Sequence, residues 1–200
     1  SLRFTMLSTV VAFSVLAVAA NALAIPLNPV DRIELASCEY PNNTANALNM
    51  YSCSTAGDTI EVKWVRITDL NGVDMYPIDP RKPFILELVA YNNGPDYEDN
   101  KVDVRLFEYQ KSWQTGKCGW AEIPTFGALN GIDGCDFAHN CPLTSGDLDL
   151  KIELDLSPYS SIISMLTANS AIQLQISMKD YNPGSKHEEI TCVEAQLRIN

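Results

Sequence analysis

Positive charge is scarce in this 200-residue sequence. Lys and Arg number 14 against 25 Asp and Glu, so the formal net charge is −11 at pH 7. A chain this acidic repels nucleic-acid phosphates and anionic membrane surfaces at neutral pH, and the repulsion weakens in an acidic compartment. We therefore expect no nucleic-acid partner.

Catalytic and metal-binding motifs are missing as well. The sequence contains no GxSxG, no HExxH and no glycine-rich phosphate loop. No CxxC pair accompanies the two histidines, His139 and His187, so we expect neither a metal site nor a cofactor. A Ser-His-Asp site assembled from distant positions is the alternative. Both histidines lie in loop-like sequence with no strained nucleophile nearby, so we expect that the protein is not an enzyme.

Only one long apolar run occurs, near the start of the sequence. Arg3 precedes the apolar residues 7–20, and Ala22-Leu23-Ala24 has the small-x-small pattern that signal peptidase recognises. The run is short for a membrane span, which favours a signal peptide over residues 1–24 rather than a membrane anchor. We expect the mature protein to be secreted or to reside in the endosomal or lysosomal lumen.

Six cysteines are present, and in a protein of the secretory pathway they predict disulfides rather than a thiolate metal site. Asn42-Asn43-Thr44 is the sole N-glycosylation sequon. We expect it to lie in a surface loop and Asn42 to be glycosylated.

Alternation of apolar and polar residues is strongest over residues 147–156. Leucines and isoleucines occupy the even positions from 148 to 156, while charged residues occupy the odd ones. Successive side chains of a strand point to opposite faces, so this pattern predicts a half-buried strand with an acidic, solvated outer face. That acidic face follows the pleat and lacks the clustered loop oxygens that calcium needs.

Further strands are predicted over residues 60–68, 84–91, 101–109, 171–179 and 190–199. The alternation slips at Trp64-Val65, which indicates a bulge or apolar contacts on both faces. Strands and turns at this spacing predict an all-β chain, an antiparallel β-sandwich that forms one domain over residues 51–200 after an irregular lead-in over residues 25–50.

The segment SPYSSIISMLTANS, residues 157–170, is unusually apolar for a connection. Its large apolar residues are Ile162, Ile163, Met165 and Leu166. One interpretation is a short helix or loop folded onto the core. The other is a lid that touches membrane or lipid.

Several short motifs occur in a suggestive order. They are Tyr51-Ser52-Cys53, Trp120-x-x-Ile123-Pro124, Cys135-x-Phe137-x-His139-x-Cys141, Pro142 with Gly146, and Tyr181-Asn182-Pro183-Gly184 before Cys192. Together they resemble the ML (lipid-recognition) domain family over roughly residues 51–199, and most closely its lysosomal ganglioside-activator and Niemann–Pick type C sterol-carrier branch. The extra cysteine-bearing loop of the activators is absent here, so their headgroup preference does not carry over.

The resemblance implies an immunoglobulin-like sandwich whose two sheets separate to hold an acyl chain, sterol or ceramide in an apolar cavity. It also implies disulfides Cys53–Cys192 and Cys135–Cys141. Cys38 and Cys118 are then left to form a third disulfide, with Cys118–Cys135 as the activator-style alternative.

Residues on the apolar faces of the strands would line such a cavity. They are Trp64, Phe84, Leu86, Leu88, Val104, Leu106, Leu150, Ile152, Leu154, Ile172, Leu174 and Ile176. We expect a lipid-binding or lipid-transfer protein that extracts a sterol, phospholipid or glycolipid during transient membrane contact. It would present this lipid to a hydrolase or receptor. The alternative is a sandwich with a filled core that acts in adhesion, defence or signalling.

Overall fold

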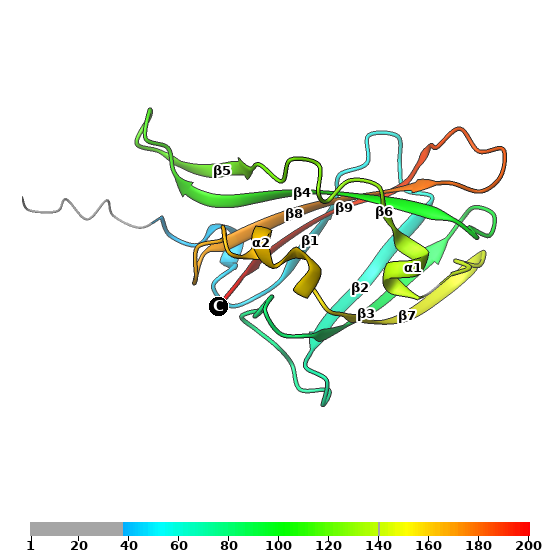
Figure 1. The fold of residues 1–200 in the computed structure, drawn as a ribbon, viewed down its shortest axis with the longest axis horizontal. Helices are drawn as coiled ribbons and strands as arrows, with labels where there is room; N and C mark the ends of the chain where they lie inside the picture. The colour runs from blue at the N-terminus through cyan, green and yellow to red at the C-terminus, as the bar shows by residue number, and fades with distance from the viewer. Residues whose placement is uncertain (1–37, 140) are drawn as a thin grey trace, which may run out of the picture. The chain divides into compact units, whose positions relative to one another are not determined.

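Antiparallel strands in two sheets make up most of the computed structural model, which describes residues 38–139 and 141–200 (Figure 1). The predicted signal peptide over residues 1–24 and the first part of the lead-in lie outside the described residues. The predicted all-β, two-sheet antiparallel fold is therefore confirmed.

The larger sheet has the strand order β1-β9-β8-β4-β5, with the short strand β6 also paired to β4. Its strands are β1 (Asn49–Ser52), β4 (Asn100–Lys111), β5 (Cys118–Ile123), β6 (Ile132–Asp133), β8 (Ala171–Asp180) and β9 (Glu189–Arg198). β1 begins inside the segment expected to be an irregular lead-in, and β5 and β6 lie between two predicted strands, residues 101–109 and 147–156.

The smaller sheet has the order β2-β3-β7, with β2 (Ile60–Thr68), β3 (Phe84–Asn92) and β7 (Gly146–Leu154). The alternation of β7 is confirmed, because Leu148 and Ile152 are buried while the charged residues between them are exposed. The strand ends at Leu154, so Leu156 lies beyond it at the start of the next turn. The predicted irregularity of β2 is a register shift between Val62 and Trp64.

Within residues 38–139 and 141–200, helical structure is limited to short segments outside the strands. They are η1 (Pro41–Asn43), α1 (Gly134–Ala138), η2 (Ser157–Tyr159) and α2 (Ser160–Ile163). Asp133 caps α1, because its side chain accepts a hydrogen bond from the backbone N–H of Asp136. α1 contacts both β4 and β7, so it connects the two sheets at this edge.

Three disulfides link the chain: Cys38–Cys118, Cys53–Cys192 and Cys135–Cys141. These are the pairings expected from the sequence, and the alternative Cys118–Cys135 pairing does not occur. Cys53–Cys192 spans 139 residues and joins the chain after β1 to β9. In the chain-entropy model, closing so long a loop stabilises the fold by up to about 5 kcal/mol.

Buried apolar side chains form two separate clusters between the sheets. The first consists of Ile78, Leu106, Leu129, Ile162, Ile172, Leu197 and Ile199. The second consists of Ile60, Ala90, Tyr97, Leu143, Leu148 and Ile190. The core is thus well packed in two places rather than along the full length of the sheets.

Candidate functional site

Cross-strand pairing places most of the predicted lining residues in two apolar rows, one on each sheet. On the larger sheet Val104 pairs with Ile176 and Leu106 with Leu174, and Ile172 follows on the same face of β8. On the smaller sheet the pairs are Phe84 with Leu154, Leu86 with Ile152 and Leu88 with Leu150. The second cluster combines buried residues of both sheets, and Ile67 of β2 packs against the first, so these rows lie on the inner faces.

Trp64 is the exception, because the structure does not place it on an inner face as expected from the sequence. The register shift between Val62 and Trp64 places Trp64 opposite Val89, and their side chains are 49% and 37% exposed. Val65 takes the inner position instead, opposite Leu88. A bulge adds one residue to a strand and so reverses which side chains point inward beyond it. Trp64 therefore lies on the outer face of the smaller sheet.

Several apolar residues of the inner faces are only half-buried and belong to neither buried cluster. They are Met50, Val65, Leu86, Leu88, Val102, Leu154, Ile176 and Val193. Interiors of folded proteins are normally packed without voids larger than a water molecule. Half-buried leucines and valines on facing sheets therefore indicate that the sheets do not close completely along this stretch. Val65 was not among the predicted residues, although the slip in alternation could have revealed it.

A pocket opens beside these residues, along the side where β1 and β9 approach β2. Its volume is about 350 Å³, and it is lined by Met50, Tyr51, Ser52, Asp58, Glu61, Val62, Thr191, Cys192 and Val193. Met50 and Val193 belong to the inner face of the larger sheet, because they pair with Ala195 and Ile176. Val62 belongs to the inner face of the smaller sheet, where it pairs with Ala90. The pocket thus lies at the open side between the two sheets, and we call it the mouth.

Polar contacts define the rim of the mouth. Asp58 Oδ1 accepts hydrogen bonds from the Cys192 N–H at 2.8 Å and from Thr191 Oγ1 at 3.3 Å. Asp58 Oδ2 accepts a further hydrogen bond from Ser52 Oγ. The two sheets are also joined next to the mouth, where the Thr59 N–H donates to the Ile190 carbonyl at 2.8 Å. This rim is held by contacts between the larger sheet and the segment that leads into β2.

A second hollow, of about 600 Å³, lies against β4, β5 and the loop that follows β5. Arg105 and Glu122 form a two-pronged ion pair there at 2.8 and 2.9 Å, and the Arg105 guanidinium holds the pKa of Glu122 below its usual value. Phe126 in the adjoining loop is 91% exposed. Val104 is the single predicted lining residue that borders this hollow.

The segment predicted to form a lid folds as η2 and α2. Ile162 is buried in the first cluster, and Leu166 packs against that cluster. Met165 is 44% exposed and Ile163 is half-buried. The segment therefore rests on the core through Ile162, as one interpretation of the sequence expected, while Met165 faces outward.

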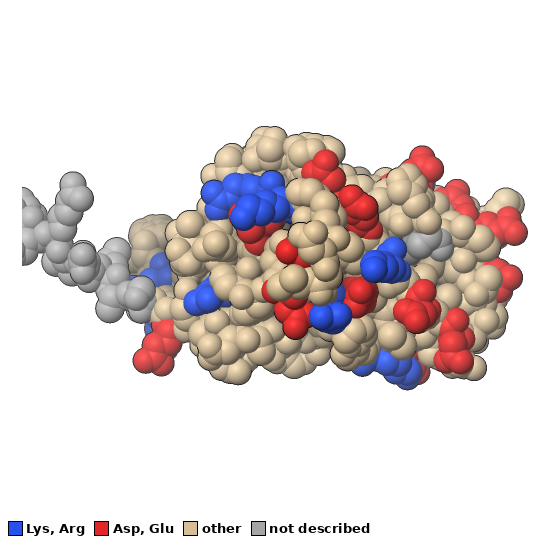
Figure 2. Space-filling model, turned by 90° about the horizontal axis from the view of Figure 1, so that it is seen from below, with Lys and Arg blue, Asp and Glu red and all other residues tan. Residues whose placement is uncertain are grey.

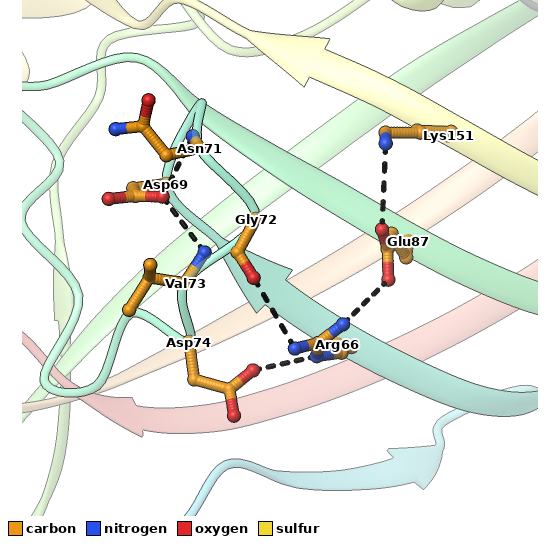
Figure 3. Close-up of polar contacts among 8 residues, drawn as sticks. All are labelled: Arg66, Asp69, Asn71, Gly72, Val73, Asp74, Glu87 and Lys151. Carbon is orange, nitrogen blue, oxygen red and sulfur yellow. Dashed lines mark hydrogen bonds and ion pairs between the residues drawn. The ribbon is translucent and has the colours of Figure 1, made fainter.

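Charged residues on the outer face of the smaller sheet form a network of ion pairs (Figure 3). Arg66 Nε contacts Asp74 Oδ1 at 2.6 Å, and Glu87 lies between Arg66 and Lys151 at 3.5 and 3.8 Å. The hydrogen bond to Asp74 raises the pKa of Arg66. The Asp69 carboxylate accepts the Val73 and Asn71 N–H groups, which lowers the pKa of Asp69. These contacts order the turn after β2 and offer no unpaired reactive group.

The remaining candidate positions show no catalytic arrangement among the described residues. His139 ends α1, and His187 stacks on Tyr181 with ring centroids 4.0 Å apart. One group of three potential metal ligands occurs in the described part of the chain, Asp99 with Asp133 and Cys135. Cys135 is held in a disulfide and Asp133 is ion-paired with Lys101 at 2.5 Å, so this donor set does not suit a metal ion.

The predicted glycosylation site lies on the surface. Asn42 is exposed in η1, and its Nδ2 donates a hydrogen bond to Gln196 Oε1 at 2.7 Å. In Figure 2, Asp and Glu are spread over the face of the molecule that is shown, with Lys and Arg between them. No helix within residues 38–139 and 141–200 is long and apolar enough to cross a bilayer.

Comparison with known proteins assigns no family. No family model matches the chain, and no curated protein matches it. Among solved structures, the C-terminal domain of wzt shares 11% sequence identity over 78% of this chain and 79% of that chain, with a TM-score of 0.37. So distant a similarity carries no argument about function.

Proposed function

We propose that this protein binds a lipid between its two sheets and transfers it between membranes, in the lumen of the secretory and endolysosomal system or outside the cell. The observation that supports this most directly is the set of half-buried apolar residues between the two core clusters. A lipid chain placed there would cover side chains such as Leu86, Leu88 and Ile176. Each methylene removed from water contributes about 0.8 kcal/mol.

The mouth offers an entry to this space. Its 350 Å³ falls within the range of about 300–1,000 Å³ that small-molecule sites occupy. Met50, Val62 and Val193 continue the apolar inner faces to the rim, so an acyl chain or sterol entering there would meet apolar side chains beside the polar residues of the rim. The resemblance to the ML domain family points to the same arrangement. The protein would act without catalysis, and a hydrolase or receptor would receive its lipid.

The segment around α2 is the proposed membrane contact. Met165 is exposed in the turn that follows α2, and Ile162 of α2 anchors this segment to the core. Apolar side chains that face water can enter the headgroup region of a bilayer.

A different function is supported by a different surface. Trp64, Val89 and Tyr91 are all exposed on the outer face of the smaller sheet, where Trp64 and Val89 are directly opposite each other. Exposed aromatic and aliphatic patches often mark protein interfaces. The alternative function, an adhesion, defence or signalling module with a filled core, would use this patch.

The deciding experiment is native mass spectrometry of protein secreted from a eukaryotic host, together with organic extraction of the same sample. If the protein transfers lipids, one lipid molecule should be bound per protein molecule, either after purification or after incubation with mixed liposomes. A mass that stays lipid-free under both conditions would overturn the proposed lipid-transfer function and favour the interaction module. In that case Trp64→Ser should abolish partner binding while the unfolding temperature stays unchanged.

A further inference from the structure

The charged groups of the mouth are all acidic. Asp58 and Glu61 are the two charged residues among its nine lining residues, and no Lys, Arg or His is among them. Lys63 Nζ is paired with Glu61, and both side chains are about half exposed (52% and 49%). A lipid head seated at this rim therefore meets the Lys63–Glu61 pair and the Asp58 carboxylate.

Asp58 carries most of this negative potential. Its hydrogen-bond donors are the Cys192 N–H and the hydroxyls of Thr191 and Ser52, which are neutral groups. These donors fix the carboxylate in place without cancelling its charge. The disulfide Cys53–Cys192 holds the same rim, so the carboxylate cannot easily move aside for an anionic ligand.

We infer that the mouth selects lipids by head-group charge, admitting neutral and zwitterionic lipids and rejecting anionic ones. This inference rests on the proposed lipid-binding function. The inner faces supply affinity for any apolar chain of suitable size, and they do not distinguish between head groups. Selectivity therefore arises where Asp58 and Glu61 meet the head group. A like charge a few ångströms away in a partly solvated site should weaken binding by roughly five- to tenfold.

Two ligands with the same acyl chain test this directly. Lysophosphatidylcholine and lysophosphatidylglycerol differ in net head charge, and both are monomeric at low concentration, so the repulsion between the acidic protein and a charged bilayer plays no part. The wild-type protein is mixed with equimolar amounts of both, and native mass spectrometry gives the ratio of the two complexes. We expect the choline lipid to be favoured about fivefold or more at low salt. The preference should shrink at 1 M salt, where the Debye length is about 3 Å.

A matched pair of variants separates local from overall charge. Glu61→Lys changes the rim, whereas Asp149→Lys makes the same change in net charge on β7, at an exposed position that pairs with Val89 on the outer face of the smaller sheet. Glu61→Lys should bring the ratio of the two complexes to about one or invert it. Asp149→Lys should leave the ratio within about twofold of wild type, because its charge is distant and screened.

The outcomes are distinct. Equal binding of both lipids by the wild-type protein, or equal effects of the two variants, would overturn selection at the mouth while lipid binding itself stands. Failure of the wild-type protein to bind either lipid would overturn the proposed function, and this inference with it.

Discussion

Ile176→Trp is the substitution that most directly tests whether there is unfilled space between the sheets. Ile176 is half-buried on the inner face of β8, between Val104 and Val193, and belongs to neither packed cluster. If the sheets leave a gap there, the larger indole covers additional apolar surface. About 50 Å² of new burial at 25 cal/mol per Å² stabilises the lipid-free protein by about 1 kcal/mol. The same indole occupies the proposed site, so lipid binding should fall.

Ile172→Trp is the matched control. Ile172 lies four residues away on the same strand and the same face, but it is 2% exposed within the first cluster. Inserting a larger side chain into a packed core costs about 1–3 kcal/mol or more. Urea unfolding followed by circular dichroism gives both free energies of unfolding. Equal destabilisation by the two substitutions would show that the central region is already filled, and would refute the argument for a cavity.

The other predictions concern the membrane contact, one tyrosine hydroxyl and one ion pair. Met165→Ser should slow lipid transfer between vesicles without changing the unfolding temperature. Ile162→Ser should lower that temperature, because Ile162 is buried in the core. If the Met165→Ser variant transfers lipid at the wild-type rate, Met165 is not the membrane contact. Tyr76→Phe should cost about 2 kcal/mol in urea unfolding, because the Tyr76 hydroxyl hydrogen-bonds backbone groups of the η1 region and of β9; an unchanged midpoint would contradict this role. The Lys179 ammonium lies 2.8 Å from the Asp103 carboxylate and holds the pKa of Asp103 below its usual 3.8. The ion pair therefore stabilises the fold fully above pH 3.8, and this stabilisation is lost as the pH falls through the lower pKa of the folded state. Asp103→Asn should therefore destabilise the protein at pH 7 and at pH 5 alike, and the difference from wild type should vanish in strong acid; a difference that grows on acidification would refute the assignment.

The structure also changes how the lid should be tested. From the sequence, the four apolar residues of the segment after β7 formed one group. In the structure Ile162 belongs to the core while Met165 faces outward. Replacing all four together would mix a folding defect with a binding defect. Periodicity cannot separate them, because in so short a helix the side that contacts the core depends on the sheets beneath it.

Strand alternation is the property that the sequence predicted best. In β7 the alternating leucines and acids are sufficient, because the two-residue period of a strand is a local property of its backbone. In β2 the same rule fails at one residue. The bulge after Val62 shifts Trp64 to the outer face, and the slip in the pattern signalled the irregularity without showing its direction. The pairing of cysteines followed from the family resemblance rather than from any local rule.

The sequence alone determined that this chain forms antiparallel sheets, which residues share most of their faces, and that its charge is strongly acidic. Whether the facing apolar rows touch is a question of the distance between the sheets. That distance depends on side chains far apart in the sequence, such as Ile162 and Leu197 in one cluster and Leu143 and Ile190 in the other. The tertiary structure alone placed Asp58 and Glu61 beside Val193 at one opening. Alternation specifies the direction of each side chain, but only the packing of the two clusters decides how much room is left between them.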